Sequence, residues 1–365
     1  MHITHFEVRV LELPYKHPVR WRSVAESSGQ YTLLRICTDD GPFGLAEVTD
    51  KPTWSGSTPK LTAQALRDIY EPLLAGIDPL APERVWDVLG RIGDWNSAKS
   101  AIDIALTDLA ARSAGLPLWK YLGGWTDDVP VAWLVNLAPP DEQFRDAAGA
   151  VEAHGFKALK VKIGRDSRQD LASIQRMREQ FGDDMNIAID ANSQYTPAQA
   201  KDVAASLHDF GVALFEDPCL LRTEQAAVQF FATSPVPVMV DRAVSTLEDA
   251  ERCVRLGAQA VALKIGRTGY RLAEAIRRHC ELAGVDCGVG VSAESGLGSL
   301  IGLHFHGAHR NLQSIPAENS FYLKLETDVL AEPPRLVDGR VKLPQTPGLG
   351  IDLDQRVLDR FSTLV

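Results

Sequence analysis

The chain has few cysteines, and their spacing excludes two common uses of this residue. The 365 residues contain five cysteines, an odd number, and no two of them form a Cys-x-x-Cys pair. We therefore expect neither a disulfide framework nor a four-cysteine zinc site. The first residues, MHITHFEVRV, also lack the apolar core of a secretory signal peptide. Both absences lead us to expect a protein of the reducing cytoplasm.

Two classes of partner are excluded by what the composition lacks. Basic residues are outnumbered, with 38 Lys and Arg against 48 Asp and Glu, which gives a net charge of −10. Such a chain lacks the basic surface that binds nucleic acid or an anionic membrane. No uncharged apolar run approaches the roughly 20 residues that span a bilayer. We expect a globular protein that binds a small molecule and whose subunits form a homo-oligomer.

The first 125 residues predict a unit of strands followed by helices. Alternation of apolar and polar residues predicts an antiparallel meander with strands at 2–13, 31–38 and 43–48. Apolar periodicity then predicts helices at 60–75, 82–92 and 98–114. This order of elements indicates an α+β unit.

Two segments of this unit, 15–30 and 49–59, are rich in Pro, Ser, Gly and bulky side chains. We expect both to be loops. Loops of this length are often lids or binding loops, although a plain surface excursion is an equal alternative.

From Val129 the pattern changes to alternating strands and helices, which is typical of a parallel β/α fold. Eight strands are predicted, at 129–137, 157–163, 186–190, 212–216, 236–241, 259–264, 286–292 and 311–316. Only seven helices separate them, because the turn-rich segment 323–352 does not predict an eighth. The sequence thus predicts a modified TIM barrel, (β/α)7β, over residues 126–322. We expect residues 1–125 and 323–365 to form an α+β capping domain.

Three acidic residues end three successive predicted strands. Asp190, Glu216 and Asp241 are 26 and 25 residues apart (216 − 190 and 241 − 216), about one strand-plus-helix unit. In a parallel barrel the C-terminal strand ends converge on one face, so the three carboxylates should meet there. Each alone would more often be a helix N-cap. Together they would repel one another unless a cation lay between them, and three carboxylates suit Mg²⁺ or Mn²⁺ better than zinc.

Three lysines accompany these acids. Lys160 and Lys162 alternate on one predicted strand and so point to the same face. They would be solvated on an edge strand, but a central parallel strand has no solvated face. Side by side and near a divalent cation, the two ammonium groups should lower each other's pKa toward the range of a general base. Lys264 ends the sixth predicted strand, across the barrel from the second, so a substrate between these strands would have a lysine on each side.

These residues together resemble the enolase superfamily and, within it, the muconate lactonizing enzyme subgroup. The Lys-x-Lys phrase at 160–162, the three acids and Lys264 match the subgroup's motifs in order and spacing. Glu294, in the phrase SAESGLGS, matches an acid of those enzymes, and the stretch 316–330 is similar to their segment after the eighth strand.

The resemblance implies a division of roles among these side chains. Catalysis would fall to Lys160, Lys162, Lys264 and Glu294. The three strand-end acids would bind Mg²⁺, which stabilises an enolate-like intermediate.

The reaction implied is that of a metal-dependent muconate cycloisomerase, acting on muconate or a similar dicarboxylate. N-acyl amino acid racemase, o-succinylbenzoate synthase and dipeptide epimerase share the half-reaction and stay open. Lysine at position 264, where related families have a His–Asp pair, disfavours sugar-acid dehydration. A Schiff-base lysine aldolase and a non-catalytic carboxylate-binding protein are alternatives of other classes.

The chain departs from the subgroup's pattern at three places. Arg242 follows Asp241 where the subgroup usually has glutamate, and we therefore expect Lys264 to have a lowered pKa. The phrase RTGY at 267–270 replaces the usual Gly-Gly. No Asp-x-Asp occurs at the seventh strand, which disfavours a dipeptide epimerase.

Further side chains are predicted to bind the substrate. These are Asn192, in the phrase IDAN, and four residues of the two loops, Arg20, Trp21, Arg22 and Trp54. The four would cap the barrel mouth and contact the part of the substrate remote from the metal. For the aromatic residues, packing between cap and barrel is an equal alternative.

Overall fold

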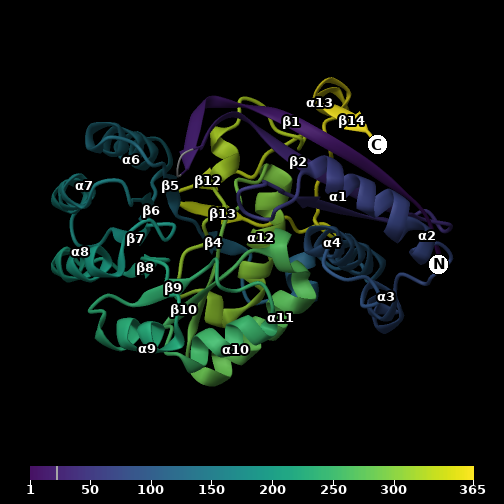
Figure 1. The fold of residues 1–365 in the computed structure, drawn as a ribbon. Coiled ribbons are helices and arrows are strands. Elements are labelled where there is room, and N and C mark those ends of the chain that lie inside the picture. Colours follow the sequence, from purple (N-terminus) through teal and green to yellow (C-terminus); the bar gives the residue numbers. More distant parts are fainter. Residues whose placement is uncertain (22–23) are drawn as a thin grey trace.

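Seven parallel strands curl into the central sheet, in the order β11-β10-β9-β8-β7-β6-β5 (Figure 1). The structure, a computed structural model, describes residues 1–21 and 24–365. The strands are β5 (Trp133–Val135), β6 (Ala158–Lys162), β7 (Asn186–Asp190), β8 (Leu214–Glu216), β9 (Val238–Val240), β10 (Ala260–Leu263) and β11 (Asp286–Val289). They are short, apolar and largely buried, as is usual for parallel strands covered on both faces.

Helices follow the strands and cover the outside of the sheet (Figure 1). They are α6 (Pro140–His154), α7 (Ser167–Phe181), α8 (Pro197–Asp209), α9 (Glu224–Thr233), α10 (Leu247–Arg255), α11 (Ile265–Ala283) and α12 (Gly296–Ala308). Several begin at a side-chain cap: Thr196 and Thr246 form capping boxes at α8 and α10. The alternation of strand and helix that the sequence predicts is confirmed, and with it the modified barrel.

The ends of the barrel differ from the prediction in two places. The expected first strand, 129–137, is divided into β4 (Asp128–Pro130) and β5, and β4 pairs outside the barrel with β13 (Arg340–Lys342). The expected eighth strand, 311–316, is instead the short helix η2 (Arg310–Leu312) followed by an extended segment. That segment still closes the barrel, because Ala317 bonds to Pro130 and Ala132, and Glu318 N donates to Val289 O at 3.0 Å. Pro316 has no N–H to donate to a strand ladder, which limits regular pairing here.

The capping unit is built on the antiparallel sheet β14-β1-β2-β3. Its strands are β1 (Ile3–Trp21), β2 (Val24–Thr38), β3 (Phe43–Val48) and β14 (Ser362–Leu364). Its helices are α1 (Pro59–Ala65), η1 (Leu66–Tyr70), α2 (Glu71–Leu74), α3 (Pro82–Leu89), α4 (Asn96–Ser113) and α5 (Leu118–Leu122). The chain after the barrel adds η3 (Phe321–Lys324), β12 (Leu336–Val337), β13 and α13 (Gln355–Phe361). Residues after 323 thus pair with both units, and the domain limits given above stay a prediction.

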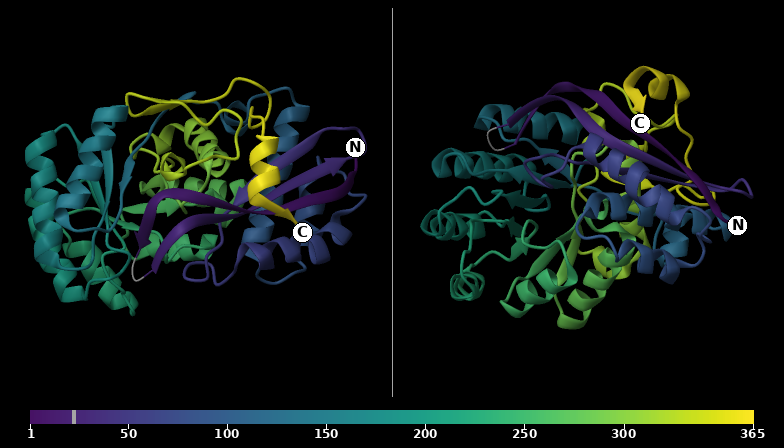
Figure 2. Two further views of the ribbon diagram at one scale, coloured as in Figure 1. Left: turned by 90° about the horizontal axis from the view of Figure 1, so that it is seen from above. Right: turned by 45° about the vertical axis from the view of Figure 1, so that its right-hand side comes forward.

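Residues 15–21 and 24–30 of the first expected loop are strand, not loop. They belong to a long hairpin in which β1 and β2 remain paired, with Val19 opposite Glu26 (Figure 2). A register shift between Pro14 and Val19 absorbs the prolines, which cannot donate to a ladder. Tyr15 and Val19 are buried in the core, so apolar burial outweighs the loop-like composition. The second expected loop, 49–59, contains no strand and runs into α1.

One buried contact joins the cap to the barrel. Asp103 of α4 accepts hydrogen bonds from Tyr270 N at 2.6 Å and Arg271 N at 3.0 Å, within α11. Gly269 makes the approach possible, because its φ is 68° and a Cβ there would lie 2.5 Å from Asp103 Oδ2. The Gly-Gly of the related subgroup is therefore half retained in RTGY. Among the described residues, no helix is long and apolar enough to cross a membrane.

Candidate active site

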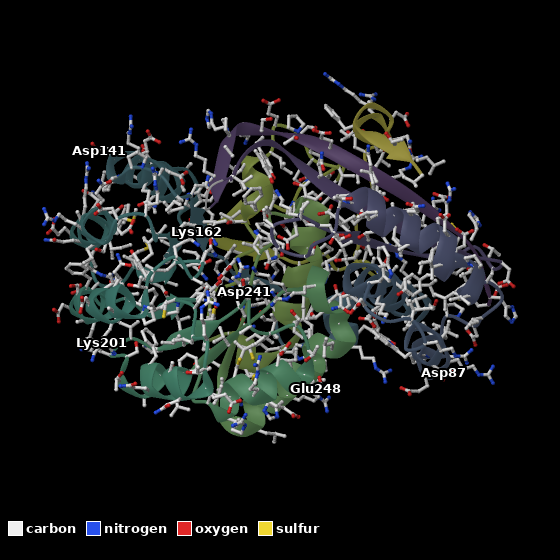
Figure 3. The ribbon with its side chains drawn as sticks, viewed as in Figure 1. Asp87, Asp141, Lys162, Lys201, Asp241 and Glu248 are labelled. Atoms are coloured by element: carbon white, nitrogen blue, oxygen red, sulfur yellow. The ribbon has the colours of Figure 1, made fainter. Side chains whose placement is uncertain are left out.

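The predicted acids and lysines meet at the C-terminal ends of the barrel strands. Lys162, Asp190 and Glu216 are the last residues of β6, β7 and β8 and lie in register with one another. Asp241 and Lys264 follow β9 and β10 directly. Figure 3 places Lys162 and Asp241 near the centre of the molecule, whereas charged residues such as Asp87 and Glu248 lie at its edge. The strand topology therefore brings the five residues to one face.

Each acid is held by a lysine. Lys162 Nζ donates to Asp190, and Lys160 Nζ donates to Glu216. Lys264 Nζ lies 2.6 Å from Asp241 Oδ2. All three carboxylates are at most 3% exposed, so these pairs lie in a region of low dielectric.

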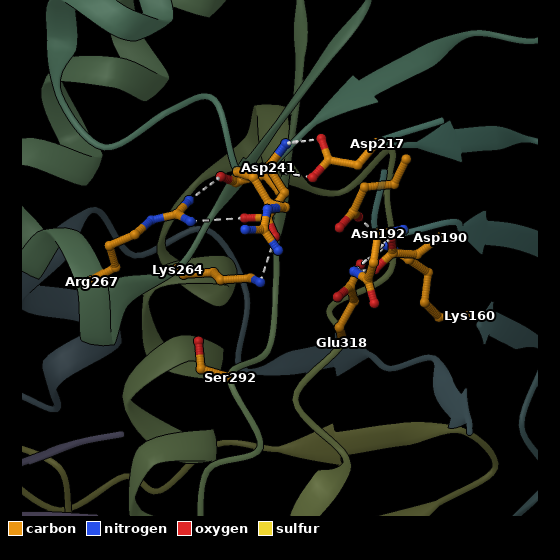
Figure 4. Close-up of polar contacts among 12 residues, drawn as sticks. Lys160, Asp190, Asn192, Asp217, Asp241, Lys264, Arg267, Ser292 and Glu318 are labelled. Carbon is orange, nitrogen blue, oxygen red and sulfur yellow. Dashed lines mark hydrogen bonds and ion pairs between the residues drawn. The ribbon is translucent and has the colours of Figure 1, made fainter. Parts of the chain in front are cut away.

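Lys160 has a second acidic partner that the sequence analysis did not single out. Glu318, in the extended segment that closes the barrel, accepts a hydrogen bond from Lys160 Nζ. Figure 4 shows Glu318 beside Lys160 and Asp190. The only signal in the sequence is an acid within the stretch 316–330, which the family resemblance already marks.

Lys160 and Lys264 do not have the lowered pKa values that the sequence suggested. Burial alone would lower the pKa of Lys160, but the charges of Glu216 and Glu318 raise it well above its ordinary value. At Lys264, burial and the charge of Arg267 would lower the pKa, but the charge of Asp241 outweighs them and the pKa is raised. The expectation for Lys264 was wrong because its ammonium pairs directly with Asp241, whose negative charge raises the pKa.

Arg267 is a second residue that the sequence analysis missed as a member of the site. Its Nη1 donates to Asp241 Oδ1 at 2.9 Å, so the two oxygens of Asp241 have different cationic partners (Figure 4). Burial would raise the pKa of Asp241, but Lys264 and Arg267 hold it below its ordinary value. The guanidinium of Arg267, in the phrase RTGY, therefore contacts one of the strand-end acids directly.

The loops after β7 and β8 are fixed by further polar contacts. Asn192, with a φ of 44°, donates from its backbone and side chain to Asp190, with Nδ2 2.8 Å from Oδ2. Asp217 accepts Asp241 N at 3.1 Å and Arg242 N at 3.2 Å. Burial, with the charges of Asp241 and Asp190, raises the pKa of Asp217 to about 6.

A cavity of ≈ 670 Å³ lies above these strand ends. Lys162, Lys264, Asp241 and Asn192 line its floor, and Trp54 and residues 94–98 of the capping unit line its other side. The volume suits a small organic molecule, and the barrel side of the cavity carries charged groups that could orient it. The cavity therefore brings both lysines to the same ligand.

Within the described part of the chain, Glu294 and Arg20 do not line this cavity. Glu294 is buried, and its carboxylate accepts Ser292 N at 2.8 Å; burial raises its pKa to about 7. Arg20 is exposed near the end of β1, which Trp21 terminates. Arg22 lies outside the described residues. Their roles stay predictions.

The three acids fit a divalent metal ion by their chemistry. They are buried hard-oxygen ligands from neighbouring strands, and burial together with the charge of Asp190 raises the pKa of Glu216 well above its ordinary range. This crowding of like charges is what a cation would relieve. Among the described residues, the one trio of ligand side chains within 4.8 Å of each other is His5, Glu7 and Cys37, on the cap. The barrel acids stand farther apart than this, and each is paired with a lysine.

Two family models together match most of the chain. One, described as "Enolase C-terminal domain-like", matches residues 143–357. The other, described as "Mandelate racemase / muconate lactonizing enzyme, N-terminal domain", matches residues 5–123.

Relatives with known activities align over nearly the whole length. Muconate cycloisomerase 1 of Rhodococcus opacus is 29% identical over 364 residues, 96% of each chain. L-Ala-D/L-Glu epimerase of Bacillus subtilis (strain 168) is 29% identical over 347 residues, 93% of each chain. The solved muconate lactonizing enzyme from Pseudomonas fluorescens, complexed with muconolactone, superposes with a TM-score of 0.94 at 29% identity over 99% of each chain. The chain therefore belongs to the enolase superfamily, in its group of muconate lactonizing enzyme-like enzymes.

Proposed function

We propose that the protein is a metal-dependent cycloisomerase that acts on muconate or a similar dicarboxylate. The observation that carries the proposal is the position of Lys162 and Lys264. They line one cavity from β6 and β10, which three strands separate in the curled sheet, and the buried acids lie between them. A substrate in this cavity has an ammonium group at each side of its reacting carbon.

The strand-end acids would hold the metal, which we propose to be Mg²⁺, with Mn²⁺ as the alternative. Enzymes of this group generally depend on a divalent metal ion. When bound, the ion would stabilise the negative charge on a carboxylate of the substrate. Asp190, Glu216 and Asp241 would be its ligands, and Asn192 and Arg267 would orient Asp190 and Asp241.

The lysines divide the remaining work. Lys160 is buried and bridges Glu216 and Glu318, so it contributes a fixed positive charge next to the bound carboxylate. Lys162 and Lys264 reach the cavity and are the groups that move a proton. The ammonium of Lys264 is paired and has a raised pKa, which disfavours its use as a Schiff-base nucleophile.

A racemase of N-acylated amino acids is the second candidate. The observation that favours it is the same pair of lysines, because racemisation needs a proton-transfer group on each face of the α-carbon. N-succinyl-L-Arg/Lys racemase of Bacillus cereus is 25% identical over 99% of this chain. A dipeptide epimerase is less favoured, because the segment after β11 lines the cavity with Val291, Ser292 and Ala293 and contributes no acid to the lining.

The test is a comparison of substrates in D₂O with Mg²⁺. Purified protein is incubated with cis,cis-muconate and with N-succinyl amino acids, and NMR follows lactone formation and α-proton exchange. Lactone from muconate without exchange of the amino acids is expected. Exchange at the α-carbon of the N-succinyl amino acids alone would establish the racemase instead. Trapping of a carbonyl substrate by borohydride would contradict both.

A further inference from the structure

Arg242 stands out among the cations of the cavity, because the other three already have acidic partners. Lys162 pairs with Asp190, and Lys264 and Arg267 share Asp241. The side chain of Arg242 is exposed, lines the cavity, and makes no hydrogen bond or ion pair within the described part of the chain. The protein has ten more acidic than basic residues, so an arginine that lines a cavity without an acidic partner is unusual. A ligand could supply that partner.

The backbone at Arg242 is fixed before any ligand arrives. The two carboxylate oxygens of Asp217 accept Asp241 N and Arg242 N, at 3.1 and 3.2 Å. Asp217 itself has a φ of 39°, a conformation that non-glycine residues rarely adopt. The loop after β9 is thus held so that residue 242 faces the cavity, which reduces the entropy that binding must cost.

The acids near Arg242 form no ion pair with its side chain. Asp241 is engaged on both oxygens by Lys264 and Arg267. Asp94, at the cavity rim, is exposed and lies beyond ion-pair distance of Arg242 in the described structure. The guanidinium is therefore available to an acidic group of a bound molecule.

We infer that Arg242 binds an anionic group of the substrate, a second carboxylate besides the one that the metal would hold. A guanidinium offers two parallel N–H donors that match the two oxygens of a carboxylate. The inference rests on the proposed function for the location of the substrate and deepens it. It makes Arg242 a residue that sets substrate specificity, at the position where the related subgroup usually has glutamate.

Inert dicarboxylates test this without any turnover. The probes are saturated α,ω-dicarboxylates from succinate to suberate and their monomethyl esters, titrated calorimetrically into the protein with Mg²⁺. Wild type should bind a dicarboxylate of suitable length roughly 10- to 100-fold more tightly than its monoester, the range for a hydrogen-bonded charged pair. Arg242→Gln should remove most of this preference while leaving monoester binding unchanged.

The control is Arg222→Gln, which removes the same charge from an exposed arginine outside the cavity. It should preserve the preference for the dicarboxylate. No preference in wild type, or an equal loss for diacid and monoester in Arg242→Gln, would overturn the inference. An Arg242-dependent preference in a protein that isomerises no carboxylate would sustain the inference and defeat the proposed function.

Discussion

At the scale of single residues, the site separates fixed charges from mobile ones. Lys160 bridges two buried carboxylates and has no freedom to move toward a substrate. Lys162 and Lys264 each have one acidic partner and line the cavity. The sequence could predict these lysines because their positions at strand ends follow from the β/α period. It could not predict Glu318 or Arg267 as partners, because those contacts depend on side chains that reach across the barrel.

Replacement of Glu216 by Gln should weaken metal binding and abolish turnover while the fold remains. The amide has nearly the same size, and burial already disfavours the charged form of this side chain. Affinity for Mn²⁺ measured by calorimetry and turnover should both fall about 100-fold or more, with the melting temperature little changed. Glu248→Gln, at the edge of the molecule (Figure 3), is the matched control. Full activity of wild type after EDTA treatment would contradict the metal assignment.

Replacement of Lys162 or Lys264 by Ala distinguishes the two candidate reactions. In a racemase each change should stop racemisation but leave exchange of one enantiomer partly intact, because each lysine serves one face. In a cycloisomerase Lys162→Ala should be inactive, and Lys264→Ala should lose about 10²- to 10³-fold, the range for one stabilising group. Rates of lactone formation and of deuterium exchange are the measurements. An inactive Lys264→Ala beside a nearly unchanged Lys162→Ala would reverse the assignment.

At the scale of elements, the segment 49–59 lines the cavity from the capping unit and is tied to the hairpin β1–β2. Lys51 is buried and pairs with Glu26 of β2, and Asp50 accepts the hydroxyls of Ser55, Thr62 and Ser97. Composition predicted the 49–59 loop but misassigned 15–30, because turn residues say little about a strand whose alternate residues are buried. Strand pairing over such a distance depends on partners that local sequence does not reveal.

Replacement of Trp54 by Ala should change substrate preference more than stability. The indole lines the cavity, lies near the Lys51 ammonium and is 39% exposed, so little apolar burial is lost on truncation. We expect KM to rise or the preferred substrate to change, with a small decrease in melting temperature. Trp125→Ala, an exposed tryptophan outside the cavity, is the control. A large fall in melting temperature with unchanged kinetics would favour the alternative of aromatic packing.

At the scale of the whole molecule, two buried histidines of α12 bind segments that are distant or near in the sequence: His304 binds the chain outside the barrel, and His306 binds the segment that closes it. His304 Nδ1 accepts Trp119 N at 3.1 Å and its Nε2 donates to Leu349 O at 3.2 Å. His306 Nε2 donates to Ile315 O at 3.0 Å, and Gln313 Nε2 lies 3.3 Å from its Nδ1. Both rings are thus satisfied in their neutral form. Burial lowers the pKa of each to about 4.

Acid should therefore destabilise the protein as these rings gain protons. A folded pKa near 4, below the ordinary 6.5, means that their contribution to stability is complete above pH 6.5 and is lost as the pH falls toward 4. Each contributes up to roughly 3 kcal/mol. His304→Asn, whose Oδ1 can still accept Trp119 N, should make the melting temperature decline less steeply between pH 6.5 and 4. His208→Asn, at an exposed position, should leave the slope unchanged. An unaltered slope in His304→Asn would contradict this account.

The pairing of β14 with β1 sets an order of events during synthesis. One edge of β1 is covered by residues made near the end of translation, through the pairs Arg9 with Leu364 and Tyr15 with Leu325. While the barrel is still emerging from the ribosome, that edge has no partner from its own chain, and an uncovered strand edge readily pairs with other chains. The cap that faces the substrate is thus completed only after the lysines and acids beneath it have been made.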